Sequence, residues 1–249
     1  MVVLCYRAED EARRVAEPIR AGFAALGVPY ELVLVANYWR EREDRTLDVV
    51  EGLAREWPEA RVVARAKRGA MGWDMRSGFA AARGDYLVVI DGDGQVPPEF
   101  AVEAYRRLKD TGADIVKGRR HARGDGSIRS LMSLTYNVAF RFLFGTWRLW
   151  DVNGRPKALT RAALERLELA TDDWFTDAEI VLKARRLGLR IVEMPVHFLE
   201  NPVRASFVGP ETVWEFARNM LSWRLGRHRA MPAPDGSRVS RPAPLRVPR

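Results

Sequence analysis

The chain has 249 residues, of which 47% are hydrophobic and 30% charged, a composition typical of a soluble globular protein with one large core. Its single cysteine, Cys5, excludes an intrachain disulfide and suits a reducing compartment, so we expect a cytoplasmic protein. We find neither a signal-peptide pattern nor about 18 uninterrupted apolar residues, so no segment is expected to cross a bilayer.

The net charge of +8 is unevenly distributed along the chain. Residues 229–249 contain five Arg and one Asp, so their net charge of 5 − 1 = +4 is half of the total. This segment is also rich in Pro and poor in large apolar residues, so we expect a disordered tail after a domain that spans 1–228. Its basicity suits an anionic membrane or RNA equally.

The first two thirds of the chain alternate helix-like and strand-like segments. A helix over 9–27 has Val15, Ile19, Phe23 and Leu26 at helical spacing, and a short apolar strand follows at 30–37. The alternation continues with helices at 44–57, 72–83 and 97–112 and strands at 60–65, 86–91 and 113–118. This order predicts an α/β fold with a doubly wound, mostly parallel sheet and helices on both faces.

The pattern changes after Gly118. It predicts helices near 127–146, 173–188 and 210–227 and a strand at 190–196. No linker separates these elements from the first part, so we expect them to complete the same single domain over its ligand crevice.

The apolar run 86–90 ends in the sequence Asp91-Gly-Asp93-Gly-Gln95. Asp and Gly are ordinary turn residues after a strand. Two acids and a Gln at alternate positions, however, project to one side of an extended segment and can converge on a hard cation such as Mg²⁺ or Mn²⁺. An EF-hand is excluded, because its Gly and Glu positions hold Val96 and Val102. The glycines also do not follow the order of a dinucleotide-binding fingerprint.

The segment "VVIDGDGQVPPE" resembles the Asp-x-Asp region of family 2 glycosyltransferases with the GT-A fold. The resemblance is strongest to the branch of dolichyl-phosphate mannose synthase and bacterial polyprenyl-phosphate glycosyltransferases, and it covers roughly 1–208. It extends to "RGAMGWDMRSGFAAARGDY", "ADIVKGRR", "IRSLMSLTYN", "DVNGRPKALTRAAL" and "WFTDAEIVLKARRLGLRIVEMPVHF". It implies a nucleotide-sugar half at about 1–118 and an acceptor half at about 119–228.

For the donor, the resemblance implies that Asp91, Asp93 and Gln95 bind the nucleotide diphosphate and a Mn²⁺ or Mg²⁺ ion, and that transfer inverts the anomeric carbon. Tyr6 matches the family near the first strand, where Arg7 and Ala8 replace Asn and Glu. Glu9 either takes the place of the missing acid or is a first-turn helix acid. Asn37 stands where the family has an acid that contacts the base, so the nucleotide, GDP or UDP, stays open.

Other basic residues of the second half match phosphate-binding positions. Arg120 matches an arginine that holds donor phosphate, a role that a bidentate guanidinium suits. Arg129 and Ser133 match positions that hold an acceptor phosphate and lie four residues apart on one helix face. Arg204 and Ser206 match an acceptor loop in which Asn201 replaces another Arg.

The sequence Thr176-Asp177-Ala178-Glu179 allows two interpretations. Thr176 and Glu179 have capping-box spacing, so Glu179 is expected to reach back to the helix start. The family has a general base here for a hydroxyl acceptor, and Asp177 would take that role. A phosphate acceptor needs no base, and Asp177 would then orient the sugar or a phosphate-binding arginine.

Segments 134–150 and 213–229 mix aromatic residues with Arg, and either pack in the core or lie at a membrane interface. We therefore expect a metal-dependent sugar transfer to a polyprenyl phosphate, by a peripheral protein at the cytoplasmic face of a membrane. A sugar hydroxyl as acceptor is the alternative. A degenerate protein that only binds nucleotide sugars or nucleic acid is disfavoured by the complete Asp-Gly-Asp-Gly-Gln sequence.

Overall fold

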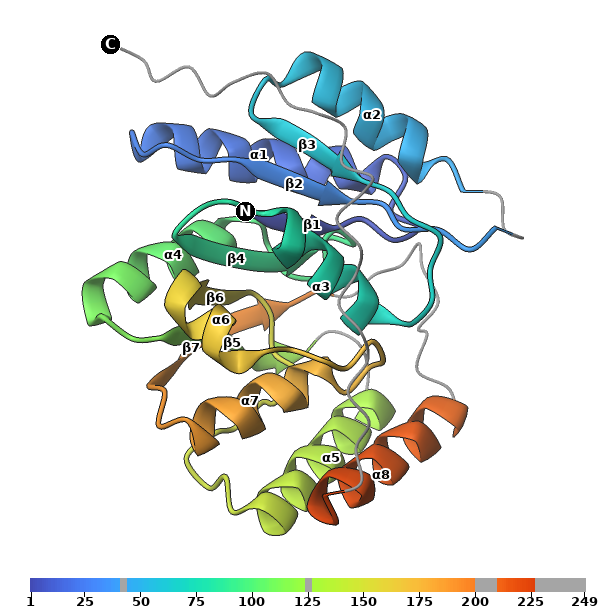
Figure 1. Ribbon diagram of the computed structural model, residues 1–249, viewed down its shortest axis with the longest axis vertical. Helices are drawn as coiled ribbons and strands as arrows, with labels where there is room; N and C mark the ends of the chain where they lie inside the picture. Colours follow the sequence, from blue (N-terminus) through green and yellow to red (C-terminus); the bar gives the residue numbers. More distant parts are fainter. Residues whose placement is uncertain (41–43, 124–126, 200–209, 227–249) are drawn as a thin grey trace.

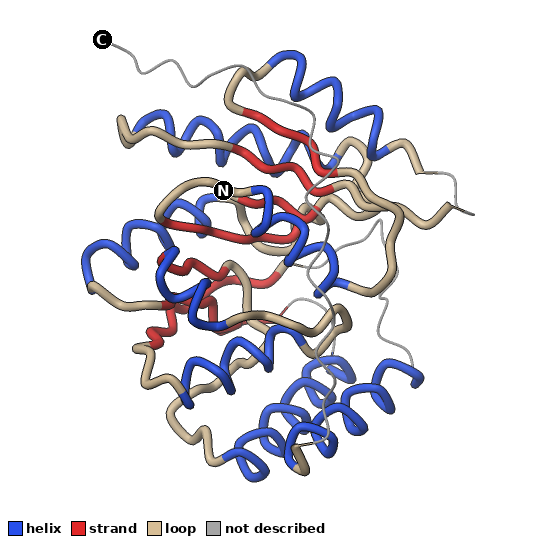
Figure 2. Tube along the Cα trace, viewed as in Figure 1, coloured by secondary structure: helices blue, strands red, loops and turns tan. Residues whose placement is uncertain are grey.

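The computed structural model describes residues 1–40, 44–123, 127–199 and 210–226. Within these ranges the chain forms one seven-stranded sheet with helices around it (Figures 1 and 2). The strands are β1 (Val2–Leu4), β2 (Leu32–Val35), β3 (Ala60–Val63), β4 (Tyr86–Asp91), β5 (Ile115–Arg123), β6 (Lys157–Thr160) and β7 (Ile191–Phe198). The helices are α1 (Glu11–Ala25), α2 (Thr46–Glu56), α3 (Met71–Ala81), α4 (Glu99–Thr111), α5 (Ser127–Phe144), α6 (Arg161–Leu167), α7 (Thr176–Arg186) and α8 (Pro210–Arg224).

The strand order is β3-β2-β1-β4-β6-β5-β7, and all neighbours are parallel except those of β6. The expected mostly parallel sheet with helices on both faces is thus confirmed. The sequence did not predict β6 or α6. Their four and seven residues follow each other without a turn, so neither shows a periodicity of its own.

Alternate residues of the strands build two hydrophobic layers. Val3, Leu34 and Ile90 face α1, α2 and α4, whereas Val2, Val35 and Val89 face α3, α6 and α7. Strands buried on both faces explain the continuous apolar runs of the sequence. A third cluster joins α5, α7 and α8 through Phe140, Phe175 and Trp223, and Figure 1 shows α5 and α8 side by side at the end of the molecule away from β3.

The antiparallel direction of β6 determines which residues meet at the functional edge. Val89 of β4 and Lys117 of β5 both pair with Lys157, the first residue of β6. The segment that enters β6 therefore lies beside the carboxyl ends of β4 and β5. Ligands of open α/β sheets bind at those ends.

No helix within the described ranges is both long and apolar enough to span a bilayer. The basic tail, 229–249, lies outside the described residues.

Candidate functional site

The turn after β4 holds the three residues expected to bind a metal. Asp91, Asp93 and Gln95 are all partly exposed, and the amide N–H of Gln95 donates to Oδ1 of Asp93 at 3.1 Å. Gly94 has a φ of +71°, and a Cβ there would lie 2.6 Å from Oε1 of Glu11. The turn therefore requires glycine at this position.

The same turn is tied to the end of β7. The amide N–H of Leu199 donates to the carbonyl of Gln95 at 2.7 Å, and Nε2 of Gln95 donates to the carbonyl of Leu199 at 3.5 Å. The chain continues from Leu199 toward Arg204 and Ser206, so the expected acceptor loop starts next to the expected metal turn. Both of these residues lie outside the described ranges.

The donor set of the turn fits a hard cation with an incomplete protein shell. Asp91 and Asp93 supply carboxylate oxygens and Gln95 an amide oxygen, which are ligand types that Mg²⁺ and Mn²⁺ accept. Among the described residues, no group of three or more acidic, His or Cys side chains could hold a metal ion. The turn offers three ligand side chains, fewer than an octahedral ion takes, so ligands from a bound diphosphate or from water would complete the coordination.

Arg155 connects this turn to α7. Its side chain is 3% exposed, with Nε 3.5 Å from Oδ1 of Asp91 and Nη1 ion-paired with Oδ1 of Asp177. The backbone of Arg155 crosses that of Gly118 very closely. A Cβ at position 118 would clash with the Arg155 carbonyl. Sequence spacing does not reveal Arg155, because its partners are far away along the chain.

Asp177 is buried between Arg155 and Lys157. Nζ of Lys157 lies 2.7 Å from the same Oδ1, and Asp177 is 2% exposed. Burial alone would raise the pKa of Asp177, but the charges of Arg155 and Lys157 outweigh burial and lower it. Burial lowers the pKa of Lys157 to about 7. A carboxylate whose pKa is lowered in this way, and which both Arg155 and Lys157 engage, is a poor general base.

Glu179 does not form the expected capping box, and that prediction is wrong. Its carboxylate accepts the backbone N–H groups of Ala170 and Thr171 at 2.8 and 2.9 Å, and the Thr171 hydroxyl at 2.7 Å. These groups belong to the loop before α7, not to the helix start. Glu179 therefore fixes the loop that precedes Asp177.

On the donor side, Asn37 is 1% exposed and bonded on both sides of its amide. Its Nδ2 donates to Oδ1 of Asp74 at 2.8 Å, and its Oδ1 accepts the Arg65 N–H at 2.9 Å. Asp74 is ion-paired with Lys67, whose ammonium lies 4.2 Å from the ring centre of Tyr6. Tyr6 and Asn37 are thus linked through Asp74 and Lys67, neither of which the sequence analysis identified. Glu9 is exposed, with a φ of +46°.

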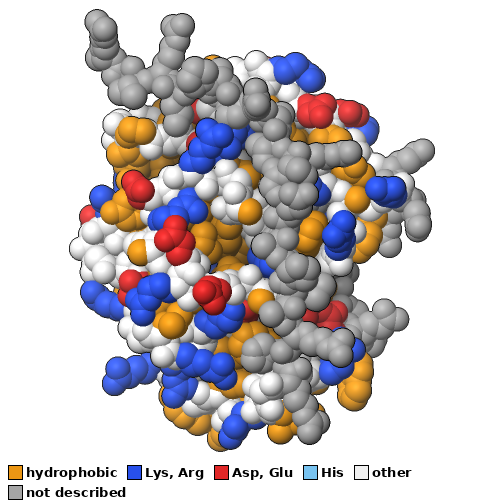
Figure 3. All heavy atoms as spheres, viewed as in Figure 1, with side chains coloured by type: hydrophobic (Ala, Val, Ile, Leu, Met, Phe, Trp, Pro, Cys, Tyr) orange, Lys and Arg blue, Asp and Glu red, His pale blue; other side chains and the backbone are white. Residues whose placement is uncertain are grey.

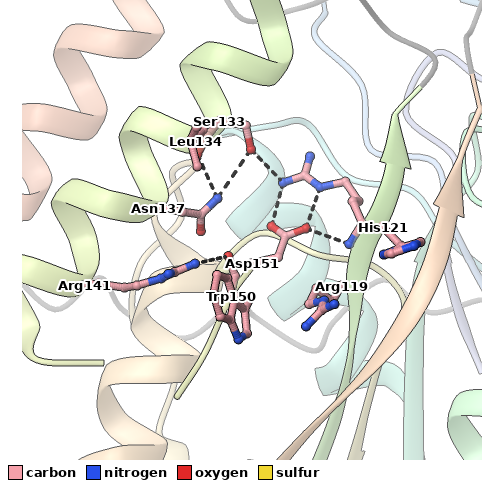
Figure 4. A pocket seen from close by; sticks show the side chains of 9 residues that line it. Arg119, His121, Ser133, Leu134, Asn137, Arg141, Trp150 and Asp151 are labelled. Atoms are coloured by element: carbon pink, nitrogen blue, oxygen red, sulfur yellow. Dashed lines mark hydrogen bonds and ion pairs between the residues drawn. The ribbon is translucent and has the colours of Figure 1, made fainter. Parts of the chain in front are cut away.

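Arg120 lies in a pocket of about 300 Å³ between β5 and α5. Its Nε and Nη2 each lie 2.7 Å from a different carboxylate oxygen of Asp151, and Nη2 lies 3.5 Å from Oγ of Ser133. The structure thus brings Arg120, expected at the donor phosphate, beside Ser133, expected at the acceptor phosphate. Figure 4 shows Ser133 of α5 joined to Asn137 and to the guanidinium that pairs with Asp151.

This pocket is basic and partly aromatic. Arg141 lies 4.2 Å from the ring centre of Trp150, and Arg119 lies 5.8 Å from it. Burial would raise the pKa of Asp151, but Arg120 and Lys117 hold it far below its usual range. The remaining residues that line the pocket are His121, Leu134 and Asn137. Arg129 lies one turn before Ser133 in α5, but its side chain is outside the described part of the structure.

Comparison with known proteins identifies the relatives of this architecture. The model of the family "Glycosyl transferase family 2" matches residues 1–167. A dolichol-phosphate mannosyltransferase of Pyrococcus furiosus is 28% identical over 80% of this chain and 57% of its own length. An undecaprenyl-phosphate mannosyltransferase of Micrococcus luteus is 27% identical over 84% of this chain and 88% of its own. Glycosyltransferase AglD of Haloferax volcanii is 29% identical over 76% of this chain and 31% of its own.

Among solved structures, glucosyl-3-phosphoglycerate synthase from Mycobacterium tuberculosis, in complex with Mn²⁺ and UDP, has a TM-score of 0.63 and 20% identity. The match covers 94% of this chain and 80% of that one. Its similarity confirms the expected GT-A fold. The chain spans little more than half of the Pyrococcus relative and a third of the Haloferax relative, but most of the Micrococcus relative.

Proposed function

Because this chain belongs to glycosyltransferase family 2, we propose that it transfers a sugar from a nucleotide donor to a polyprenyl phosphate, with inversion and with the help of Mn²⁺ or Mg²⁺. The donor would occupy the half formed by about 1–118 and the acceptor the half formed by about 119–228. The names of the Pyrococcus and Micrococcus relatives, both polyprenyl-phosphate mannosyltransferases, support this acceptor.

One observation carries the proposal. Arg155 is buried between Asp91, at the expected metal turn, and Asp177, at the start of α7. Two acids that are 86 positions apart in the sequence thus share one guanidinium. An ion-pair chain of this kind keeps the donor turn and α7 at a fixed separation, so that the donor and the acceptor can be aligned.

Asp91, Asp93 and Gln95 would hold the metal ion at the donor diphosphate. A divalent cation there neutralises the charge that grows on the departing nucleoside diphosphate. The solved Mycobacterium structures in complex with Mn²⁺ or Mg²⁺ and UDP support a divalent ion as cofactor. GDP and UDP remain alternative donors, because Asn37 presents both a donor and an acceptor and is engaged with Asp74 and Arg65.

The state of Asp177 favours a phosphate acceptor over a sugar hydroxyl. A hydroxyl must lose a proton to a base during attack, whereas Asp177 is buried and paired with Arg155 and Lys157. A phosphate oxygen forms its bond to the anomeric carbon without losing a proton. The bond from that carbon to the donor diphosphate breaks, and its electron pair leaves with the diphosphate. In this reaction Asp177 is a positioning residue.

The pocket around Arg120 and Ser133 would bind the acceptor phosphate, together with Arg129, Arg204 and Ser206. The contacts with Asp151 already hold the Arg120 side chain in one orientation, so binding a second anion there costs little side-chain conformational entropy. Arg129, one turn before Ser133, would reach the same phosphate. In this arrangement we propose that Arg120 serves the acceptor as well as the donor.

The experiment that tests this function measures nucleotide release. The protein is incubated with Mn²⁺, a polyprenyl phosphate and a panel of UDP- and GDP-linked sugars, and the released UDP or GDP is quantified. We expect release with one nucleotide class and none after EDTA treatment. Salt-sensitive RNA binding without binding of any nucleotide sugar would instead favour the non-catalytic alternative.

A further inference from the structure

Helix α5 presents three rows of side chains, each with a spacing of four residues. The core row packs against α7 and α8 and consists of Tyr136, Phe140 and Phe144. The pocket row lines the pocket described above and consists of Ser133, Asn137 and Arg141. The outward row points away from the core and consists of Leu134, which also lines the pocket, Val138 and Phe142. The polar pocket row therefore lies between two apolar rows.

The outward row is unusually exposed for apolar side chains. Phe142 is 69% exposed, and its ring packs at 4.8 Å against the ring of Trp147, which is 57% exposed. Leu131, near the start of α5, and Trp150, after its end, are also exposed apolar side chains. Figure 3 shows hydrophobic and basic side chains together at the end of the molecule where α5 and α8 lie. Contiguous apolar exposure of this kind marks a contact surface.

We propose that the outward row, with Trp147 and Trp150, is a docking surface for an anionic phospholipid bilayer. Residues 127–150 contain three Arg and no Asp or Glu, so this surface is complementary to negative headgroups. Trp rings and Arg side chains at the edge of an apolar row are suited to the boundary between headgroups and acyl chains.

A second copy of this chain is a poorer occupant of the surface. In a symmetric dimer each patch faces itself, so the Arg residues of one copy would oppose those of the other with no acid between them. A bilayer supplies the missing negative charge and also covers the apolar rings.

The position of the pocket also supports a bilayer as the occupant of the docking surface. Ser133 and Arg141 lie on the helix face next to Leu134 and Phe142, so the pocket opens beside the docking surface. When the outward row enters the acyl boundary, the pocket lies at the depth of the phosphates. This part of the inference rests on the proposed function, because it places the phosphate of a membrane-borne acceptor at Arg120.

Vesicle sedimentation of the full chain tests the surface. The binding of wild type and of the double variant Val138→Ser/Phe142→Ser is compared on vesicles with equal parts of phosphatidylglycerol and phosphatidylcholine, and on phosphatidylcholine alone. We expect wild type to prefer the anionic vesicles and the double variant to bind them at least about ten-fold more weakly. Leu187→Ser, an exposed leucine at the end of α7, is the matched control and should bind as wild type does.

Two further variants separate the contributions. Trp147→Ser should weaken binding to both kinds of vesicle, whereas Arg148→Glu should remove mainly the preference for anionic lipid. All variants retain the basic tail, so differences between them report on the α5 region. Circular dichroism confirms that each variant is folded.

Unchanged vesicle binding by both the double variant and Trp147→Ser would overturn the inference. It would also be overturned if wild type were a dimer in ultracentrifugation and the double variant a monomer. The double variant should still transfer sugar to a short, water-soluble polyprenyl phosphate. If no lipid phosphate accepts sugar but vesicle binding follows the expected pattern, the proposed function fails and the docking surface stands.

Discussion

Nζ of Lys157 lies 2.7 Å from Oδ1 of Asp177, and neither side chain is more than 3% exposed. This pair joins the first residue of β6 to the first turn of α7. With Arg155 on the same carboxylate, it makes Asp177 the anchor of a charged network that ends at Asp91. Removing one member of such a network leaves a buried charge without its partner.

The first prediction concerns the stability of the protein at alkaline pH. Lys157 has an ordinary pKa of 10.5, and burial first, then Arg155 and Lys117, lower the pKa to about 7 in the folded chain. Between these values the unfolded chain binds more protons than the folded chain, so the free energy of unfolding rises with pH. Urea unfolding at several pH values should show a contribution of at most about 1.4 kcal/mol per pH unit.

Lys157→Met should lack this contribution, so its stability curve should rise less steeply than that of wild type above pH 7. Lys109→Met, at an exposed lysine of α4, is the control and should retain the wild-type slope. Parallel curves for wild type and Lys157→Met would mean that Lys157 stays charged in the folded protein throughout this range.

The second prediction tests the metal turn. Asp93→Asn keeps the size of the side chain but removes its charge, so calorimetric binding of UDP or GDP with Mn²⁺ should weaken at least about ten-fold. Because Asp93 is partly exposed, the free energy of unfolding should change by about 0.5 kcal/mol or less. The control Asp110→Asn, at an exposed position of α4, should bind as wild type does. Equal binding by both variants would refute the assignment of the metal turn.

The third prediction tests Arg155 as a positioning residue. Arg155→Lys keeps a positive charge but cannot contact Asp91 and Asp177 from two sides of a planar group. We expect kcat to fall by about 100-fold, with KM values for donor and acceptor nearly unchanged. A rise in the donor KM with normal kcat would instead show that Arg155 binds the donor in its ground state.

The fourth prediction concerns Asn37. Asn37→Asp would restore the acid of the family pattern. It would also replace Nδ2, which donates to Oδ1 of Asp74 at 2.8 Å, by a carboxylate oxygen. We expect the free energy of unfolding to decrease by about 2 kcal/mol or more at pH 7, because two buried like charges would meet. Urea unfolding measures this change. The decrease in the free energy of unfolding should be smaller in acid, where one of the two carboxyls is protonated. If Asn37→Asp were as stable as wild type but preferred another nucleobase, Asn37 would face the donor.

The sequence contained most of the fold because the strands of the parallel sheet are apolar on both faces. Runs such as 86–90 and 32–35 therefore stood out from amphipathic helices such as 97–112. The four residues of β6 did not stand out, and so neither did its antiparallel direction. That direction brings Arg155 and Lys157 to the functional edge.

For the site, motif spacing identified the residues that lie on one turn, Asp91, Asp93 and Gln95. It could not identify partners brought together by folding, such as Asp151 with Arg120 or Asp74 with Asn37. The spacing of Thr176 and Glu179 was misleading, because Glu179 binds loop N–H groups that compete with the helix start for the same carboxylate.

The most direct test of the account compares two acceptors that differ only in the phosphate. Wild-type protein with Mn²⁺ and the donor identified by nucleotide release is given a polyprenyl phosphate or the corresponding polyprenol, and labelled products are separated by chromatography. We expect a glycosylated lipid phosphate, no product from the alcohol, and a strong loss of product for Ser133→Ala combined with Arg129→Ala. Transfer to the alcohol or to a sugar hydroxyl, with no product from the phosphate, would contradict it.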